Sequence, residues 1–283
     1  MSYYHYTSNK SFVSIVSNRS FRMSELSLSN DYLEGKWLRN VFSEACDKKN
    51  VKAEHKAELL VLLDRVLGLF TYVGFCLSKK RDSLSQWIGY ADDGCGVSIK
   101  LDRQFVENLA ENGVLNRKIE RVDVVYSHSK QVEMLASHIE KLRRYIERGA
   151  FARYGLLSLY SDDQRREHAV ARSEMWLYFL NFISMAYSMK NPAFGEEKEV
   201  RLISNVPVLD EGSVIKFNGD VLGFYANNDV IVPFIDAPIE GRRAIREVIL
   251  GPKNRTPVYV IKTLLEKYGF EKVKVEASNA SYR

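Results

Sequence analysis

Two glutamates and an arginine alternate along one short segment of the chain, in the stretch GEEKEVRLIS. Glu197, Glu199 and Arg201 are each two residues apart. Side chains of a β-strand point alternately to its two faces, so a strand over 199–204 would place all three on one face. A carboxylate fixed by an arginine there can bind a ribose hydroxyl or stabilise a developing cation, and the arginine can also bind a phosphate. The alternative is an exposed charged strand edge, which discourages aggregation.

A histidine lies in an aromatic segment near the N-terminus. The stretch YYHYTS is typical of a short strand from Tyr3 to Thr7, with His5 at its centre. A strand histidine beside the hydroxyl groups of Thr7 and Ser8 can hold a ribose or an amide group. The alternative is a half-buried histidine whose hydrogen bond serves only the structure.

Aromatic residues occur again in the central segment from Tyr72 to Leu101, whose pattern predicts strand, turn, short helix, glycine-rich turn and strand. Ser83 followed by Gln86 has the form of a capping box at the start of the helix. Trp87 and Tyr90 are three residues apart and therefore share one helical face. They can stack on a planar ligand, although aromatic residues at this spacing more often belong to the core.

The remaining periodicity predicts an α+β protein with a mixed, mostly antiparallel sheet. The longer expected helices cover 32–46, 54–70, 130–148, 161–189 and 257–268. The expected strands of the second half cover 199–204, 214–217, 221–225, 230–232, 244–250 and 272–276. The last strand, helix and strand permit a parallel βαβ-like unit. We expect residues 1–283 to form a single domain with a long helical insert at about 127–190.

The composition indicates an ordinary globular protein. Hydrophobic residues make up 46% of the chain, and 41 Lys and Arg against 36 Asp and Glu give a net charge of +5, without the dense basic stripe typical of nucleic-acid binding. The three cysteines are odd in number and form no C-x-x-C pair, which favours a reducing cytoplasm. The start of the chain lacks the pattern of a signal peptide. The apolar stretch from Met175 to Met189 is too short and too polar to predict a membrane span.

The common catalytic motifs are absent. The chain contains no G-x-S-x-G, no G-x-x-x-x-G-K-[ST], no G-x-G-x-x-G and no H-E-x-x-H. The five histidines do not pair at the spacing of metal ligands within one predicted element. We therefore expect no metal site.

Several blocks of sequence carry a resemblance to a known family. In chain order they are residues 4–8, 23–24, 30–34, 75–78, 85–92, 94–99, 196–202, 248–253 and 278–283. Together these blocks resemble a bacterial family catalogued as domain of unknown function 2971. The tail departs from the family pattern, because Asn279, Ala280 and Ser281 replace the expected apolar and proline residues before Tyr-Arg. The family itself implies no activity.

A second resemblance is to the three-part signature of ADP-ribosyltransferases, which bind NAD with a strand histidine, a serine or aromatic block and a late glutamate. It implies that His5 binds the nicotinamide-side ribose or the amide. Tyr90 or Trp87 would pack on the nicotinamide ring. Glu199 would bond the ribose 2′-hydroxyl and stabilise the oxocarbenium-like charge as nicotinamide leaves.

The same resemblance implies a set of supporting residues around NAD. Ser78 and Arg201 would support the site directly, and the Ser-Thr-Ser triplet of these enzymes is missing. The full set expected to contact the cofactor consists of Tyr6, Thr7, Ser78, Trp87, Glu197 and Arg201. A one-residue error in strand register would turn Glu199 away from the site, so the choice between Glu197 and Glu199 stays open here.

Three functions follow as expectations. The first is an NAD-consuming transferase or hydrolase that acts as a bacterial toxin or phage-defence effector, with a protein or nucleic-acid acceptor left open. The second is a ligand-sensing or interaction module without chemistry. The third is an enzyme that acts on nucleic acid, for which the basic helical segment from Lys141 to Arg148 argues weakly.

Overall fold

The computed structural model describes residues 2–28, 35–115, 117–152, 160–207, 222–227 and 230–282. Its strands are β1 (Tyr3–Thr7), β2 (Ser20–Glu25), β3 (Phe70–Ser78), β4 (Val97–Leu101), β5 (Glu120–Asp123), β6 (Glu199–Pro207), β7 (Gly223–Asn227), β8 (Val230–Pro238), β9 (Ile245–Leu250) and β10 (Lys274–Ala277). Its α-helices are α1 (Asn9–Asn18), α2 (Trp37–Lys48), α3 (Ala53–Gly68), α4 (Leu84–Tyr90), α5 (Arg103–Asn112), α6 (His128–Glu147), α7 (Asp162–Phe179), α8 (Asn181–Ala186) and α9 (Val258–Lys267).

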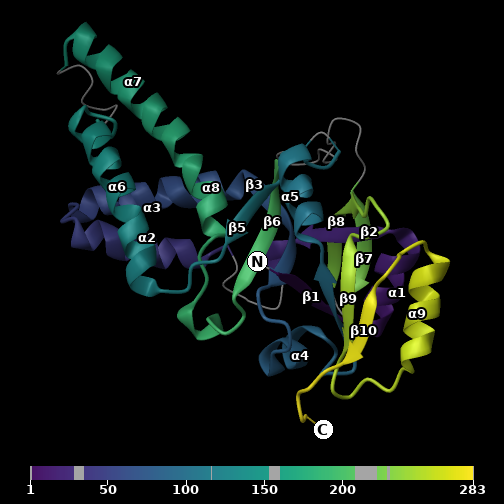
Figure 1. The fold of residues 1–283 in the computed structure, drawn as a ribbon. Coiled ribbons are helices and arrows are strands. Elements are labelled where there is room, and N and C mark those ends of the chain that lie inside the picture. Colours follow the sequence, from purple (N-terminus) through teal and green to yellow (C-terminus); the bar gives the residue numbers. More distant parts are fainter. Residues whose placement is uncertain are drawn as a thin grey trace.

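The strands form one mixed sheet of ten strands (Figure 1). Its order is β10-β9-β4-β1-β3-β2-β8-β7, with β6 beside β3 and β5 beside β6. Among the pairs of named strands, β9 and β10 are parallel and the others are antiparallel. Helix α9 connects the parallel pair. The predicted α+β class, with a mostly antiparallel sheet and a C-terminal βαβ-like unit, is confirmed.

The sheet splits at one edge of β3. On its other edge β3 pairs with β6 along its whole length. On the split edge β1 pairs with β3 only between Tyr4 and Ser78, and β2 pairs only with Val73 and Gly74. Residues 75–77 therefore have no strand partner on that edge in the described part of the chain. Because β1 and β2 diverge here, side chains must satisfy the backbone groups that the ladder leaves open.

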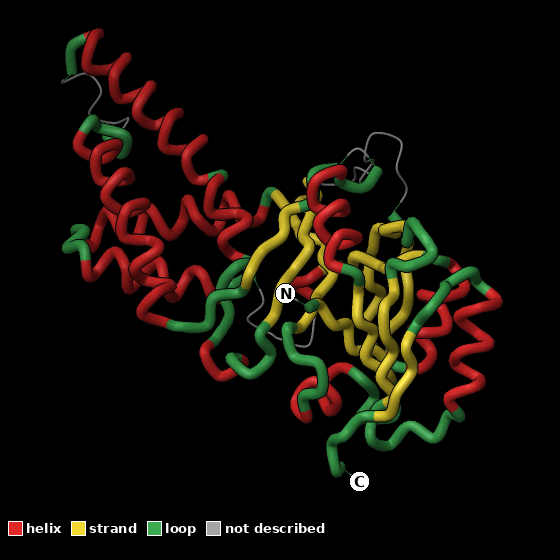
Figure 2. The backbone as a smooth tube through the Cα atoms, viewed as in Figure 1, coloured by secondary structure: helices red, strands yellow, loops and turns green. Residues whose placement is uncertain are grey.

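Two large hydrophobic cores hold most of the helices to the sheet, and a smaller cluster around Trp87 packs α4 on β1. One contains Phe12 of α1, Phe105 of α5 and Ile261 of α9, packed against the inner residues of β1, β3, β4 and β9. The other joins α2, α3, α6, α7 and α8 to β3 and β6, and includes Leu59 and Phe182. The helices between β5 and β6 thus pack with α2 and α3, and the far ends of α6 and α7 extend away from the sheet (Figures 1 and 2).

Several predicted boundaries are wrong in detail. The helix expected over 161–189 is two helices, α7 and α8, which meet at Leu180. The helix expected over 54–70 ends at Gly68, because Phe70 already belongs to β3. Strand β8 is longer than the predicted 230–232. The expected strand over 214–217, and residues 30–34, lie outside the described residues. Within those residues no helix has both the length and the apolar character needed to cross a bilayer.

The turn before β4 leaves no room for a side chain at Gly96. A Cβ there would lie 2.1 Å from the Thr7 carbonyl oxygen and 2.9 Å from that of Ala91. Both neighbours are backbone atoms, so Gly96→Ala must push β1 away from the turn. We expect it to lower the free energy of unfolding by about 3 kcal/mol, at the upper end of the usual overpacking cost.

The matched control is Gly89→Ala in α4, where a new Cβ meets nothing within 4 Å. Alanine favours a helix over glycine, so this variant should be at least as stable as the wild type. Urea denaturation of both variants provides the comparison. Equal stability of the two would show that the turn yields without strain.

Candidate functional site

A small cavity of about 80 Å³ lies beside the split in the sheet, between β1, β3, α4 and β6. Segments that are far apart in the sequence meet in its wall. The predicted site residues that line it are His5, Tyr6, Ser78, Tyr90, Glu197, Glu199 and Arg201. Both carboxylates and the arginine face the cavity. Glu199 and Arg201 do so by alternation along β6, whereas Glu197 lies in the turn before the strand and is separated from it by Lys198, whose φ is 47°.

Two of the predicted residues do not line this cavity. Trp87 is completely buried against Tyr6 and donates from Nε1 to Asp82 Oδ1 at 2.6 Å, so it is a core residue and offers no face to a ligand. Thr7 lines a different cavity, described below. The predicted capping box is also wrong, because the Ser83 side chain caps no backbone N–H of the helix and Gln86 instead lines the small cavity.

Four buried charges form the floor of the site. The Lys190 ammonium lies 2.7 Å from Glu197 Oε2 and 3.7 Å from Glu199 Oε2. Arg201 Nη2 lies 2.8 Å from Glu199 Oε2. All four residues are less than 10% exposed: Lys190 3%, Glu197 7%, Glu199 8% and Arg201 1%. Two carboxylates and two cations balance, as burial of charge requires. We call these four residues the charge quartet.

The charge quartet corrects one alternative from the sequence. Strand β6 is not an exposed edge, because it lies between β3 and β5. Its charged face is turned inward, toward α4 and the end of α8. Sequence reasoning missed Lys190, since a lysine after an apolar helix carries no local sign of burial.

The electrostatics favour the ionised forms of Glu199 and Lys190. Burial alone would raise the pKa of Glu199, but the charges of Arg201 and Lys190 outweigh it and hold that pKa below its usual value. Burial alone would lower the pKa of Lys190, and Glu199 and Glu197 raise it instead. Burial and the charge of Glu197 raise the pKa of Tyr90, so its hydroxyl stays protonated and donates to Glu197 Oε1 at 2.7 Å.

Backbone contacts from neighbouring elements position the charge quartet. Gln131 of α6 is buried and donates from Nε2 to the Lys190 carbonyl oxygen at 2.8 Å. The Ser78 hydroxyl donates to the Glu197 carbonyl oxygen at 2.6 Å. The Glu199 N–H donates to the hydroxyl of Tyr126. Ser78 therefore holds the backbone at Glu197, in the turn just before β6.

His5 fills the split itself. Its Nδ1 lies 3.0 Å from the Cys76 carbonyl oxygen, in the stretch of β3 that has no strand partner on this edge. A carbonyl can only accept, so Nδ1 carries the proton and Nε2 is left as an acceptor. The ring also packs on Phe75, with centroids 4.4 Å apart. Burial lowers the pKa of His5 to about 4, against the opposing hydrogen bond to Cys76, so the ring is neutral at pH 7.

The C-terminal tail holds α4 in place. Asp82, just before α4, accepts from the Ser278 hydroxyl at 2.6 Å and from the Asn279 N–H at 2.8 Å. Asp93, just after α4, accepts from the Tyr282 hydroxyl at 2.7 Å and from Lys253 at 2.8 Å. The tail thus fastens both ends of the helix that carries Tyr90.

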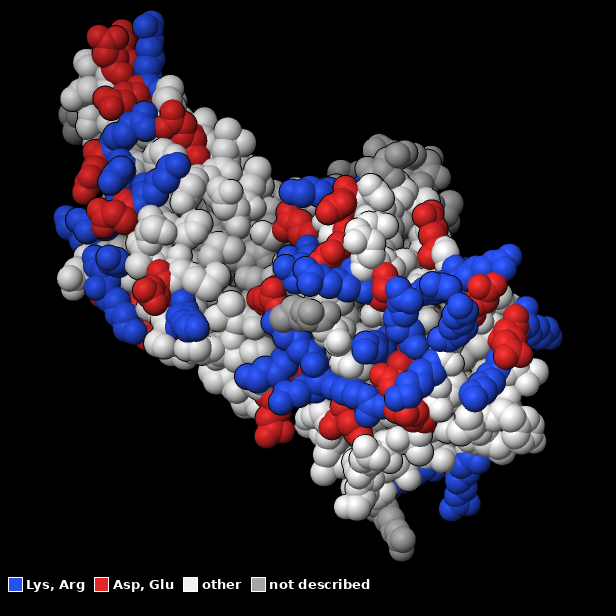
Figure 3. Space-filling view, viewed as in Figure 1, with Lys and Arg blue, Asp and Glu red and all other residues white. Residues whose placement is uncertain are grey.

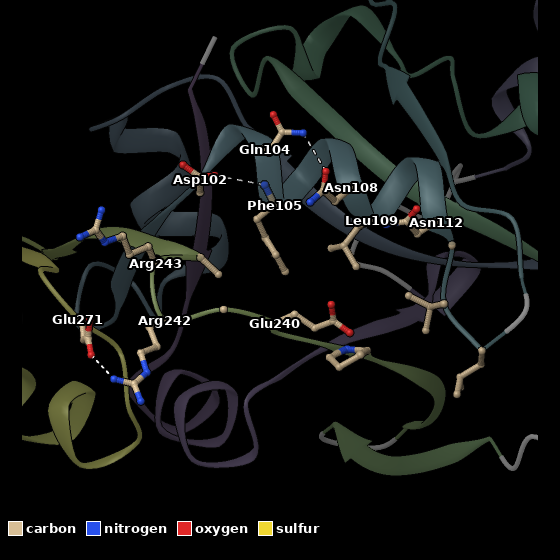
Figure 4. Close-up of a pocket in the computed structure, with 16 residues that line it drawn as sticks. Asp102, Gln104, Phe105, Asn108, Leu109, Asn112, Glu240, Arg242, Arg243 and Glu271 are labelled. Atoms are coloured by element: carbon tan, nitrogen blue, oxygen red, sulfur yellow. Dashed lines mark hydrogen bonds and ion pairs between the residues drawn. The ribbon is translucent and has the colours of Figure 1, made fainter.

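A larger cavity of about 600 Å³ lies between α5 and the segment that joins β8 to β9 (Figure 4). Its wall includes Phe105 and Leu109, and Arg242 pairs with Glu271 at its rim. None of the predicted site residues lines it. Across the described residues, the structure also groups no three side chains that could ligate a metal ion.

Comparison with known proteins bears on the family. Residues 86–202 match a family model described as Protein of unknown function (DUF2971). The resemblance to this family is confirmed over those residues. The DUF2971 segment contributes Tyr90, Lys190 and both carboxylates to the site, whereas His5 and Ser78 lie outside it. No curated protein and no solved structure matches the chain.

The lowered pKa of His5 predicts a pH dependence of stability. The folded protein binds this proton only near pH 4, whereas the unfolded chain binds it near pH 6.5. Between these pH values the unfolded state holds more protons at His5 than the folded state does. The titration of His5 therefore lowers the free energy of unfolding as the pH falls from 6.5 towards 4. We expect His5→Gln, whose amide can still donate to Cys76, to lose less stability between pH 7 and pH 5 than the wild type. Parallel losses in urea titrations at both pH values would contradict this.

Removal of one cation from the charge quartet should strongly lower the free energy of unfolding. Arg201→Met leaves the Glu199 carboxylate buried without its nearest partner, and such changes cost about 3–5 kcal/mol. Arg242→Met breaks the exposed pair with Glu271 and should change the free energy of unfolding by less than about 1 kcal/mol. Urea denaturation at pH 7 compares the two. A loss in Arg201→Met no larger than in Arg242→Met would mean that Glu199 is not held by Arg201.

Proposed function

We propose that this protein cleaves the N-glycosidic bond of NAD, as an ADP-ribosyltransferase or an NAD glycohydrolase. The observation that carries the proposal is the meeting of His5, Tyr90 and Glu199, from β1, α4 and β6, around one cavity. Each was assigned to NAD from its place in the sequence, and nothing in the sequence requires the three to be neighbours. Their shared wall is therefore independent support for the assignment.

The carboxylates have room for ribose hydroxyls. Each ionised carboxylate offers about four acceptor positions. Glu197 accepts from Tyr90 and Lys190, and Glu199 accepts from Arg201 and the Cys76 thiol, with Lys190 further away. Acceptor capacity thus remains on both carboxylates for the donors of a diol. The neutral His5, with Nε2 as an acceptor, suits a second hydroxyl or the amide N–H of nicotinamide.

The proposed step breaks the bond between ribose C1′ and the pyridinium nitrogen. The bonding electron pair goes to nicotinamide, which leaves as a neutral molecule. The positive charge that develops on the ribose faces the ionised Glu199, which stabilises it electrostatically. Water, or the nucleophile of an acceptor, then adds to C1′ and releases a proton.

The size of the cavity limits what it holds. At about 80 Å³ it is smaller than the 300–1,000 Å³ typical of small-molecule sites, so only the reacting end of the dinucleotide can enter it, and the cavity must widen to admit that end. The remainder of NAD must lie outside it. We propose that its biological role is that of a cytoplasmic toxin or phage-defence effector that depletes NAD. The three cysteines are free in the structure, as a reducing compartment allows.

One observation favours a second candidate, a ligand-binding module without chemistry. Both carboxylates already form ion pairs inside the charge quartet, so the fold needs them whatever the site does. The nucleic-acid alternative has less support. Figure 3 shows Lys and Arg side chains spread across the middle of one face, mixed with acidic ones. Ion pairs also occupy several basic residues of the described chain, as Arg81 pairs with Glu247 and Arg246 with Asp102.

The direct test is nicotinamide release from NAD, followed by chromatography. We expect Glu199→Gln to reduce the rate at least about 100-fold, as the loss of one charge-stabilising group does in other enzymes. Glu271→Gln, at the exposed pair with Arg242, is the matched control and should leave the rate unchanged. Tyr90→Phe removes a single hydroxyl and gives a second variant if Glu199→Gln folds poorly.

The outcomes separate the candidates. Equal rates in the wild type and a folded Glu199→Gln would remove Glu199 from the chemistry. A thermal shift with NAD but no release would favour the binding module. If NAD causes no thermal shift and no nicotinamide is released, the NAD proposal is overturned.

A further inference from the structure

A third cavity, of about 690 Å³, lies between β1, α1, β2 and β7, and His5 lines both this cavity and the small one. It occupies the space that opens where β1 and β2 diverge from each other beside β3. Its volume falls within the range typical of sites for small molecules. We call it the serine cavity, because Ser8, Ser11, Ser14, Ser20 and Ser24 all contribute to its wall.

The lining of the serine cavity is polar, and its serine hydroxyls bond one another or neighbouring side chains. The Ser8 hydroxyl bonds that of Ser11, and Ser14 accepts from Asn18 while its own proton stays available. Hydroxyl groups rotate to donate or accept as a ligand requires. Such a wall suits a ligand rich in hydroxyl and phosphate oxygens. Tyr225 adds an aromatic surface to the same wall.

The charges of the serine cavity favour an anion. Lys10 and Arg22 line it, and neither forms an ion pair within the described residues. Asp236 is the acidic residue in the described lining, and it accepts from the Ser20 hydroxyl. His5 is neutral. The described lining is thus net positive, and the planar guanidinium of Arg22 suits phosphate recognition.

Arg22 is also held in place. Its guanidinium lies 4.6 Å from the ring centre of Phe234 and 5.3 Å from that of Tyr225. A cation stacked on aromatic rings keeps its position at less entropic cost than a free side chain. An ordered arginine, a lysine and rotatable hydroxyls therefore surround one space of ligand size.

We infer that the serine cavity binds a nucleoside phosphate, with phosphate at Arg22 and Lys10, ribose at the serines and the base near Tyr225. The inference rests on the proposed function for one point, the identification of this group with the ADP half of NAD. Because His5 lines both cavities, that half would lie next to the reacting end. Nucleotide binding itself can be measured without any cleavage.

The experiment is calorimetric titration of the full chain with ADP at low salt. We expect binding to the wild type and at least a tenfold weaker affinity in Arg22→Gln and in Lys10→Gln. The matched control is Lys262→Gln, which removes an exposed cation from α9, outside the lining of the serine cavity. Arg22 and Lys10 are exposed at the cavity wall, so both variants should fold, and melting curves check this.

Each outcome decides one point. No ADP binding to the wild type, or equal weakening in Arg22→Gln and Lys262→Gln, would overturn the inference. If inorganic phosphate binds the site with the same affinity as ADP, the serine cavity is a simple anion site. That result would overturn the assignment of the ribose and the base. ADP binding without nicotinamide release would keep the nucleotide site and reject NAD cleavage. If nicotinamide is released from NAD and ADP does not inhibit that release, the serine cavity does not hold the ADP half of NAD.

Discussion

Strands β1 and β2 pair with the same edge of β3 and then diverge, and the rest of the site depends on that geometry. Because β1 and β2 cannot both pair with residues 75–77, the ladder opens there. The ring of His5 takes over the open carbonyl of Cys76. The small cavity lies beside this point and the serine cavity lies between the diverging strands. A fully paired sheet would have left no room for either.

Electrostatic balance imposes the second constraint. Two carboxylates reach the small cavity, Glu199 from β6 and Glu197 from the turn before it, and Lys190 and Arg201 are buried with them and balance their charge. The pairing serves stability and leaves acceptor positions on the same oxygen atoms. The ion pairs of the charge quartet would therefore not prevent the carboxylates from binding the ligand that we propose.

The sequence predicts these features unequally. The shared face of Glu199 and Arg201 follows from strand periodicity, since a two-residue spacing fixes direction once the strand is known. The direction of Glu197 does not follow, because it lies in the turn before β6. The burial of Lys190 does not follow, because it depends on carboxylates brought from another segment. Trp87 shows the reverse case: its spacing with Tyr90 is the same in a core and in a ligand site, and only the packing around Asp82 decides. The split at β3 is also invisible in the sequence, because pairing of strands far apart in the chain produces it.

The tail gives α4 an unusual attachment, which bears on how a ligand enters. The helix packs on the aromatic residues of β1, and its two ends are fastened by Ser278 and Tyr282 through Asp82 and Asp93. These bonds involve few residues and lie near the surface, so they belong to the part of a protein that opens at a low free energy. Detachment of the tail would free the helix that carries Tyr90 while every strand stays paired. Entry to the cavity would then be a local fraying event, and slowing of amide hydrogen exchange in α4 would report a bound ligand.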